Sequence, residues 1–552
     1  MNLNKLFTAL RQRKNTPAHN QQAGRHERYT HALEQFLDGQ PAVRLGGAYT
    51  LANLADEWLT DTSLPEQVRR EEAQTIVDAL TGCIRMSYPL AQKRQVLEAN
   101  EAPEEYQGDF TRDQEALREE QLVRRTVFME LSRRLAAIIK SPEKGNEEGQ
   151  NTVPPISPMW ANLRFDFGGA PIFYPLRQLH FQNADFASAT FYGPADFSGA
   201  TFYGDTSFSA AQFTADASFH GANFTDWVGF SAAHFAGAAE FSGARFVDAA
   251  SFATVTFTGE ADFSDAVFSA AADFAVSAFK SDANFSRLNT AGIASFAAVT
   301  FDGKAVFTAS TFHDETHFAA SVFNRPAVFS KSLFGGAARF AGIATKQTAI
   351  FCNVRFAGAA DFSGATFTQY ADFSGARFDG DAMFSRSSFF AVIRTSYDMD
   401  FPQYANFANA AFAQGADFSE ATFTAFVGFG RATFAGAVSF NGANFAGAYF
   451  AGAYFADAKF SQKADFRQTR FAYAEPSFWD SEGQQKSARF SAQANPQDYL
   501  FEVRPESPHG FSCGEAQLLN RTFVLPVGAV LYDPDSWDEE KQEYTRVSEP
   551  AQ

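Results

Sequence analysis

The chain has little cysteine, little tryptophan and no long hydrophobic run. Its three cysteines, Cys83, Cys352 and Cys513, are far apart and odd in number, which argues against a disulfide framework and favours buried thiols in a reduced cytoplasm. No stretch of 18 apolar residues occurs, so the sequence predicts no helix that spans a bilayer. Basic residues are also outnumbered, with 45 Lys and Arg against 63 Asp and Glu, for a formal net charge of −18. We therefore expect no direct binding to nucleic acid.

Residues 1–14 lack the apolar core of a secretory signal but have a helical pattern. Leu3, Leu6, Phe7 and Leu10 recur at helical spacing beside basic side chains. A basic amphipathic helix of this kind can lie on a membrane surface, and the alternative is a helix that docks on its own domain. The sequence thus predicts a cytoplasmic protein, with peripheral membrane contact through residues 1–14 as an alternative.

Composition divides the chain into four regions. Residues 1–140 are charged with helical periodicity, and residues 141–160 are a polar, proline-rich linker. A phenylalanine repeat occupies 161–475, and residues 476–552 are expected to cap it and to end in an acidic tail. Within that last region, residues 520–532 are expected to form one or two strands around Pro526 and Gly528.

Phenylalanine, in contrast, is abundant and dominates the aromatic residues. The chain has 65 Phe against 16 Tyr and 5 Trp, which indicates one repeated structural slot. From Phe186 to Phe285 the spacing alternates between five and six residues, an 11-residue period. Such steps fit neither a helix nor a flat strand; they fit a short extended segment followed by a corner. The predicted core ladder at the full period consists of Phe186, Phe197, Phe208, Phe219, Phe230, Phe241, Phe252, Phe263, Phe274 and Phe285.

Alanine stands two residues before nearly every Phe, as in Ala195-Asp196-Phe197. Positions two apart in an extended segment face the same side, so Ala and Phe point inward and the residue between them points to solvent. The small Ala leaves the volume that the large Phe fills. The pattern predicts a continuous aromatic core that needs no cofactor.

The triplets Ala-Asp-Phe and Ala-Asn-Phe resemble the pattern Ala-(Asp/Asn)-(Leu/Phe)-X-X of the pentapeptide-repeat family. The resemblance covers more than half of the chain and implies a mainly β fold, a right-handed quadrilateral β-helix, here preceded by a small all-α domain. Because two 11-residue periods follow one another here, we expect a coil of 22 residues, longer than four pentapeptides. The repeat would then make about 13 coils and a rod roughly 60 Å long. The triplets have their acidic or amide residue at Asp185, Asp196, Asp262, Asn284, Asp361, Asp372, Asn406, Asp417, Asn444 and Asp465.

Three interruptions break the repeat. Thr290 and Thr345 stand where Phe is due, and the segment 391–401 is longer and polar. We expect a local bulge at each of them in preference to a ligand site.

The helical region contains the segment VRLGGAYTLANLA at 43–55. It resembles a HEAT-like helical repeat, and it is similar to an Arg-Leu-Gly-Gly segment of bacterial pentapeptide-repeat proteins of unknown function. Many of those proteins have membrane-spanning helices just before it. Gly46-Gly47 lacks the following Gly-Lys-Ser/Thr and the preceding strand of a phosphate-binding loop, so we expect close helix packing there. We expect Arg44, Asp56 and Glu57 to cap or pair within the helices.

No set of residues in the sequence predicts catalysis or metal binding. His313 and His317 flank two acidic residues, but all four fall at outward positions of the repeat and are interpreted as solvated. The acidic run 533–540 lacks the glycine and the ligand alternation of a calcium loop. No Gly-x-Ser-x-Gly motif and no Cys-His pair occurs. The sequence predicts no catalytic residue, no cofactor and no metal, and hence no enzyme.

The sequence therefore predicts a non-enzymatic scaffold with an unknown protein partner. The first alternative is a modulator of DNA gyrase, because topoisomerase-directed members of the resembled family present an acidic, DNA-like rod. Twelve acidic residues between 185 and 282 stand against Arg245 and Lys280, with Asp262, Asp265 and Asp273 as the candidate interaction face. The second alternative is a membrane-peripheral sensor or defence component that depends on residues 1–14.

Overall fold

The computed structural model describes residues 17–135, 160, 162–176, 180–390, 405–446, 453–480 and 486–552. The chain folds as two compact units, Met1–Ala215 and Asp216–Gln552. The division between these units, called unit 1 and unit 2, falls inside the phenylalanine repeat. The predicted break at 391–401 lies outside the described residues.

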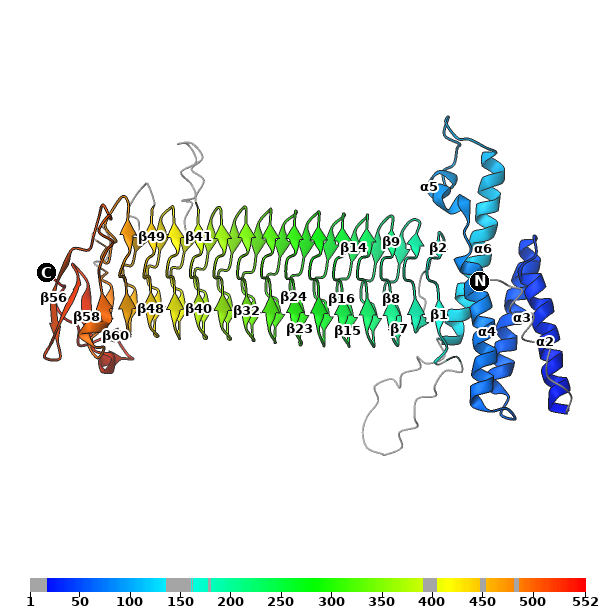
Figure 1. Cartoon of the computed structure of the whole chain (residues 1–552), viewed down its shortest axis with the longest axis horizontal. Helices are drawn as coiled ribbons and strands as arrows, with labels where there is room; N and C mark the ends of the chain where they lie inside the picture. Colours follow the sequence, from blue (N-terminus) through cyan, green and yellow to red (C-terminus); the bar gives the residue numbers. More distant parts are fainter. Residues whose placement is uncertain are drawn as a thin grey trace. The chain divides into compact units, whose positions relative to one another are not determined.

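The described part of unit 1 begins with helices (Figure 1). α2 packs against α3, and α3 packs against α4. A Cβ at Gly47 of α3 would lie 2.4 Å from the backbone nitrogen of Phe36 and 2.7 Å from the carbonyl oxygen of Ala32, so only glycine allows this approach. The predicted close packing is confirmed for Gly47, whereas a Cβ at Gly46 would meet no atom within 4 Å. The helices are α2 (Pro17–Phe36), α3 (Pro41–Thr60), α4 (Glu66–Arg85), η1 (Pro89–Lys93), α5 (Arg94–Leu97) and α6 (Phe110–Leu135).

Two of these helices, α4 and α6, cover the first strands of the repeat within unit 1. Phe128 of α6 stacks on Phe167 with ring centroids 4.6 Å apart. The Ser132 hydroxyl accepts the backbone N–H of His180 at 2.9 Å. An uncovered first turn would leave aromatic rings and strand edges in water, and these contacts prevent that. The strands of unit 1 are β1 (Phe165–Asp166), β2 (Pro171–Ile172), β3 (His180–Gln182), β4 (Ala184–Asp185), β5 (Thr190–Phe191), β6 (Ala195–Asp196), β7 (Thr201–Tyr203), β8 (Thr206–Ser207) and β9 (Gln212–Phe213).

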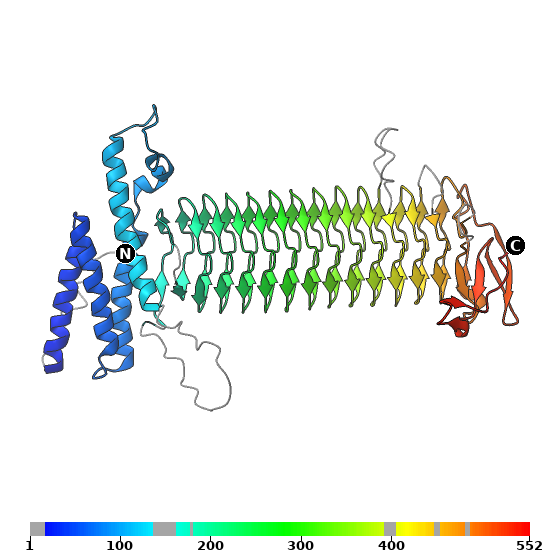
Figure 2. The ribbon, with the colours of Figure 1, turned by 180° about the vertical axis from the view of Figure 1, so that it is seen from behind.

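Unit 2 is a parallel solenoid with four sheets (Figure 2). Consecutive strands enter sheets A, B, D and C in turn, so A and D are opposite sides of the coil, as are B and C. Sheet A contains β12 (Val228–Gly229), β16 (Ala250–Ser251), β20 (Ala272–Asp273), β24 (Ala294–Ser295), β28 (Thr316–His317), β32 (Ala338–Arg339), β36 (Ala360–Asp361), β40 (Ala382–Met383), β44 (Ala416–Asp417), β48 (Val438–Ser439), β52 (Ala464–Asp465) and β55 (Tyr499–Leu500). Sheet B contains β13 (His234–Phe235), β17 (Thr256–Phe257), β21 (Ala278–Phe279), β25 (Thr300–Phe301), β29 (Val322–Phe323), β33 (Ala344–Thr345), β37 (Thr366–Phe367), β41 (Ser388–Phe389), β45 (Thr422–Phe423), β49 (Asn444–Phe445) and β53 (Arg470–Phe471).

The other two sheets complete the coil. Sheet D contains β10 (Ala217–Ser218), β14 (Ala239–Glu240), β18 (Ala261–Asp262), β22 (Ala283–Asn284), β26 (Ala305–Val306), β30 (Ala327–Val328), β34 (Ala349–Ile350), β38 (Ala371–Asp372), β42 (Ala405–Asn406), β46 (Val427–Gly428) and β50 (Ala453–Tyr454). Sheet C contains β11 (Asn223–Phe224), β15 (Arg245–Phe246), β19 (Val267–Phe268), β23 (Asn289–Thr290), β27 (Thr311–Phe312), β31 (Leu333–Phe334), β35 (Arg355–Phe356), β39 (Arg377–Phe378), β43 (Ala411–Phe412), β47 (Thr433–Phe434), β51 (Lys459–Phe460), β54 (Arg489–Ser491) and β58 (Val530–Tyr532).

The strand register confirms the predicted coil of 22 residues. Ala217 pairs with Ala239, and Ala239 pairs with Ala261, so each step along sheet D advances the sequence by 22. The repeat makes about 13 turns around four sides, as the spacing and the resemblance to pentapeptide repeats together predict. The corners with a five-residue step between successive phenylalanines each turn through a left-handed residue, such as Asp265 (φ 58°) and Gly243 (φ 65°).

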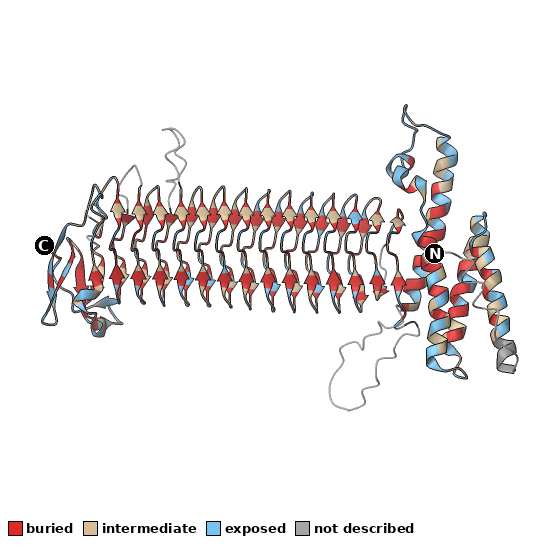
Figure 3. Cartoon of the chain, viewed as in Figure 1, coloured by how far each residue is buried: buried red, intermediate tan, exposed pale blue. Residues whose placement is uncertain are grey.

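The interior of unit 2 is a stack of phenylalanine rings. Phe219 and Phe241 on sheet D are parallel with centroids 4.8 Å apart, and Phe230 from sheet A meets Phe241 edge-on at 5.4 Å. Stacked contacts along each sheet and edge-to-face contacts across the coil are both favourable for aromatic rings. Figure 3 shows the result, with buried and partly exposed residues alternating along the strands.

Thr290 and Thr345 do not cause bulges, contrary to the expectation. Thr290 pairs in register with Phe268 and Phe312, and Thr345 pairs with Phe323 and Phe367. In each case the residue two positions earlier is large instead of Ala: Leu288 and Ile343 are both buried. The larger side chain two positions earlier, which also points into the coil, partly fills the volume lost when Thr replaces Phe. The coil therefore continues without a bulge.

We predict that Leu288 and Thr290 are coupled in their effect on stability. Thr290→Phe overpacks the coil and costs about 1–3 kcal/mol, and Leu288→Ala opens a cavity that costs about 2–5 kcal/mol. The double variant restores the usual Ala and Phe arrangement, so its loss should be smaller than the sum by at least about 1 kcal/mol. Hydrogen exchange of the amides around β23 measures all three, and additive losses would contradict the compensation.

The C-terminal region of unit 2 covers the last coil. β54 pairs with β51 and with β58 in sheet C. The free side of β58 is then covered by residues 548–551, since Ser548 donates to Leu531 at 3.0 Å and Ala551 donates to Ala529 at 2.8 Å. The predicted strands around Pro526 and Gly528 are β57 and β58. The remaining elements are η3 (Pro496–Asp498), the hairpins β56 (Cys513–Leu518) with β57 (Arg521–Pro526) and β59 (Trp537–Asp538) with β60 (Glu543–Tyr544), and η4 (Pro534–Ser536).

Candidate interaction faces of the solenoid

Each two-residue strand of the coil in unit 2 has one position on the outer side, which we call its outward slot, and in most strands this residue is at least partly exposed. In sheets A and D this is the second residue of the strand, and in sheets B and C it is the first. The inward residues are held by the aromatic core, so the outward slots form straight columns with one residue per coil. Another molecule can contact unit 2 at these outward columns and at the corners between them.

The outward slots are sorted by charge. Among the described strands of unit 2, the outward slots of sheets B and C contain no carboxylate. Most of the basic outward slots lie on sheet C. Sheets A and D hold the acidic ones, with Arg339 as a basic exception on sheet A. The acidic slots are Asp273, Asp361, Asp417 and Asp465 on sheet A and Glu240, Asp262 and Asp372 on sheet D; the basic slots of sheet C are Arg245, Arg355, Arg377, Lys459 and Arg489.

The three predicted acidic residues do not share a face. Asp262 lies on sheet D and Asp273 lies on sheet A, at the opposite side of the coil. Asp265 lies at the corner between sheets D and C and pairs with Arg287 through two contacts of 2.6 Å. The Arg287 hydrogen bond lowers the pKa of Asp265. The structure therefore separates these carboxylates and pairs one of them with a cation.

The predicted core ladder lies inside the coil. All ten phenylalanines from Phe186 to Phe285 at the 11-residue period are buried, with no exposed surface. They alternate between sheets A and D, which the period alone did not show, so the ladder is two facing stacks in each unit.

The remaining polar residues of unit 2 that the sequence singled out include His313, His317 and their acidic neighbours. No group of three or more His, Cys, Asp or Glu is placed to hold a metal ion in the described part of the chain. His313 is exposed, and His317 lies 3.5 Å from Glu315, which also pairs with Arg339. A shallow hollow of about 350 Å³ lies over sheet A between Met383 and Asp465. Asp465 there pairs with Arg467 at 2.6 Å, so its charge is already balanced.

The cysteines differ in their surroundings more than the sequence predicts. Cys83 is buried in unit 1, and burial raises the pKa of its thiol. Cys352 is half-buried beside Ser330, and Cys513 is exposed. The expectation of buried thiols thus fits Cys83 and does not fit Cys513.

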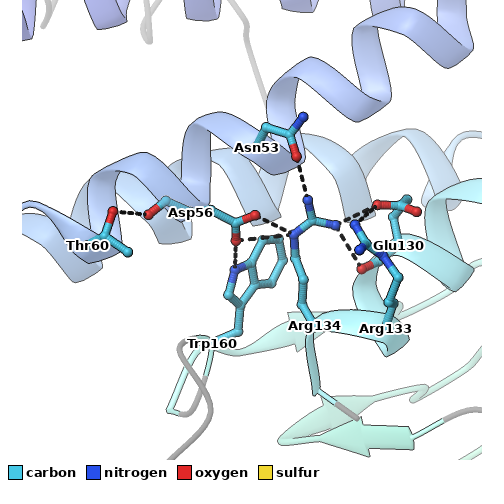
Figure 4. Close-up of polar contacts among 7 residues, drawn as sticks. All are labelled: Asn53, Asp56, Thr60, Glu130, Arg133, Arg134 and Trp160. Carbon is cyan, nitrogen blue, oxygen red and sulfur yellow. Dashed lines mark hydrogen bonds and ion pairs between the residues drawn. The ribbon is translucent and has the colours of Figure 1, made fainter. Parts of the chain in front are cut away.

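A polar cluster in unit 1 joins helices α3 and α6 to the start of the repeat (Figure 4). Asp56 accepts the indole N–H of Trp160 at 2.6 Å and the Nε–H of Arg134 at 2.9 Å. Arg134 also donates to Asn53 at 2.9 Å and to Glu130 at 2.6 Å. Trp160 is fully buried, so this cluster anchors the repeat and offers no open site. The sequence alone suggested pairing at Asp56 but not its partners, because Trp160 is 104 positions away.

A second buried cluster in unit 1 surrounds Glu120. Arg44 donates to it at 2.5 Å and Arg124 at 2.6 Å, and Arg124 also donates to the carbonyl of Ile84 at 2.8 Å. Arg124 thereby satisfies a free carbonyl at the end of α4. Burial raises the pKa of Glu120, but the hydrogen bonds from the two arginines outweigh it, so the pKa lies below the ordinary value.

We predict that unit 1 loses stability in acid through Glu120. Because the folded pKa is depressed, the stabilisation is complete above the unfolded pKa of about 4.3 and is lost as pH falls through the folded value. Glu120→Gln cannot titrate, so the gap between its thermal midpoint and that of the natural chain should narrow as the pH falls below about 4.3 and should close as it falls through the folded pKa. Circular dichroism at the helical band measures this, and a gap that is independent of pH would contradict it.

Comparison with protein families shows which type of sequence repeat the solenoid contains. Sequence models of pentapeptide repeats match residues 186–234, 346–388 and 431–471, and these segments lie in the four-sided parallel coil described above. These matched segments therefore belong to the pentapeptide-repeat families. No curated protein and no solved structure matches the chain. Within the described residues, no helix combines the length and the apolar content needed to cross a bilayer.

Proposed function

We propose that the chain is a non-enzymatic scaffold that binds a protein partner on the outward faces of its pentapeptide-repeat solenoid. The observation that carries this proposal is the sorting of charge among the outward slots of unit 2. Carboxylates occupy sheets A and D, and arginine and lysine occupy mainly sheet C. A fold whose purpose was only to be soluble needs no such sorting, whereas complementary charge selects and orients a partner.

The core of unit 2 supports the proposal because side chains of the chain itself fill it. Phenylalanine rings fill the coil of unit 2, and among described residues no metal-binding group is assembled. Fold alone does not decide activity, so the proposal rests on the surface columns.

A photo-crosslinking scan around one coil tests the proposal. The strands β18 to β21 offer one outward slot on each sheet: Asp262 on D, Val267 on C, Asp273 on A and Ala278 on B. A photoreactive phenylalanine analogue is placed at each slot in turn, and the cells that make the protein are irradiated. We expect one protein to be crosslinked from one or two faces. Equal crosslinking from all four faces, or none from any, would contradict the scaffold.

The same scan separates the proposal from its alternatives. A DNA-like acidic rod directed at gyrase predicts crosslinks to a topoisomerase from both Asp262 and Asp273, although these residues lie on opposite sheets. It also predicts that charge reversal at Asp262, Asp265 and Asp273 abolishes an effect on gyrase. A membrane-peripheral role predicts that deleting residues 1–14 releases the protein from membranes.

A further inference from the structure

Sheet D of unit 2 differs from the other three sheets in having two chemically distinct blocks in one column. Its outward slots are acidic at Glu240 and Asp262, pass through Asn284, and are then aliphatic at Val306, Val328 and Ile350. Three successive aliphatic slots occur on no other sheet among the described strands of unit 2. Asp372 follows and ends the apolar block.

The residue just before each of these strands lies at a corner of the coil. These corner residues show the same division between an acidic part and an apolar part. Asp216, Glu260 and Asp282 precede strands of the acidic part, and Pro326 precedes the strand of Val328. Lys304 is the basic residue at this position, and it lies at the boundary between the blocks. The acidic block therefore has a surplus of negative charge, and Lys304 is the one charged residue at these positions of the apolar block.

The aliphatic slots remain accessible. Val306, Val328 and Ile350 are all partly exposed in a parallel sheet. Contiguous exposed apolar side chains next to a charged rim are the usual mark of a protein-binding surface. Rigid strands beneath them mean that the partner meets a preformed surface.

The dimensions of the column select a helix as the partner. Six coil steps separate β10 from β34, and at about 4.8 Å per step they span roughly 29 Å. A helix of about 20 residues has this length, and its diameter of about 10 Å is similar to the width of a short sheet. A helix laid along the column would need apolar side chains over one half and basic side chains over the other.

We propose, building on the scaffold function, that sheet D binds an α-helical segment of a partner protein that is basic in one half and apolar in the other. The basic half lies over Glu240 and Asp262, and the apolar half lies over Val306, Val328 and Ile350. Charge complementarity orients the helix on the column, and burial of the aliphatic slots adds affinity.

Two peptides of identical composition test the proposal on the full chain. Both have 20 residues of Leu, Lys and Ala; one has leucine in one half and lysine in the other, and its isomer interleaves them. We expect the block peptide to bind at least tenfold more tightly in fluorescence anisotropy. Equal binding, or no binding of either peptide, overturns the proposal.

Matched variants locate the site. Val328 on sheet D and Val322 on sheet B occupy outward slots of consecutive strands. Asp262 on sheet D and Asp273 on sheet A each accept the N–H two residues ahead at 2.9 Å. Val328→Glu and Asp262→Lys should each weaken the binding of the block peptide at least tenfold. Val322→Glu and Asp273→Lys should leave its affinity unchanged. Equal loss in the control variants overturns the proposal.

Two other outcomes are distinguishable. If the full chain sediments as a dimer that Val328→Glu dissociates, a second copy covers the apolar block and the proposal is wrong. If crosslinks to a partner arise only from sheets A, B or C, the scaffold function stands and the assignment to sheet D fails.

Discussion

Phe263→Asp is expected to open the solenoid of unit 2 in its interior. Phe263 has no exposed surface, stacks on Phe241 at 4.8 Å and on Phe285 at 5.1 Å, and meets Phe252 edge-on at 5.2 Å. Loss of a buried Phe costs about 3–5 kcal/mol, and a buried carboxylate without a partner adds several more. Because each coil is held by its neighbours, the loss should spread to the adjoining turns.

Limited proteolysis with mass mapping measures this opening. We expect new cleavage sites around Phe263 in the variant and none there in the natural chain. Asp262→Ala is the control, because Asp262 is adjacent in sequence and points outward; it should change the cleavage pattern little. A variant as resistant as the natural chain would show that the ring stack does not hold the coil.

Asp56→Ala is expected to detach the helices of unit 1 from the start of the repeat. The substitution leaves the Arg134 guanidinium and the indole N–H of Trp160 without their shared acceptor, and both side chains are nearly or fully buried. Breaking such a pair costs about 3 kcal/mol. Native-state hydrogen exchange should therefore rise in α6 and in β1.

Glu57→Ala is the matched control for Asp56→Ala. Glu57 is the next residue and pairs with Arg28, but both side chains of that pair are about half exposed. Exposed pairs contribute less than about 1 kcal/mol, so exchange in α6 and β1 should stay near the natural level. Equal effects of the two substitutions would mean that the cluster of Figure 4 is not an anchor.

Sequence spacing could predict the solenoid because the inward slots obey a strict rule. A Phe every five or six residues with Ala two before it determines which side chains face inward, and hence the 22-residue register. The same rule misled at Thr290, where a missing Phe suggested a bulge. The volume left by a missing Phe can be filled by a larger side chain at another inward position, as Leu288 does. A rule that treats each position separately cannot predict this compensation.

The faces of the solenoid were harder to predict than its core. Counting acidic residues along the chain grouped Asp262 with Asp273, yet these residues are half a coil apart and lie on opposite sheets. Residues 22 positions apart are the true neighbours, as Asp262 and Asn284 show. Reading the sequence in steps of 22 would have found the aliphatic column of Val306, Val328 and Ile350. The partners of Asp56 and Glu120 could not be found this way, because helix packing has no such period.

The measurement that tests the account most directly is a spin-label distance series along sheet D. In a chain with Cys83→Ala, Cys352→Ser and Cys513→Ser, one label replaces Ser218 and a second replaces Val306, Ile350 or Tyr454. These slots are four, six and ten coil steps away. A rigid solenoid predicts narrow distributions that lengthen linearly, by about 4.8 Å for each step. Broad distributions, or distances that do not grow in proportion to the number of coils, would contradict a scaffold with fixed outward columns.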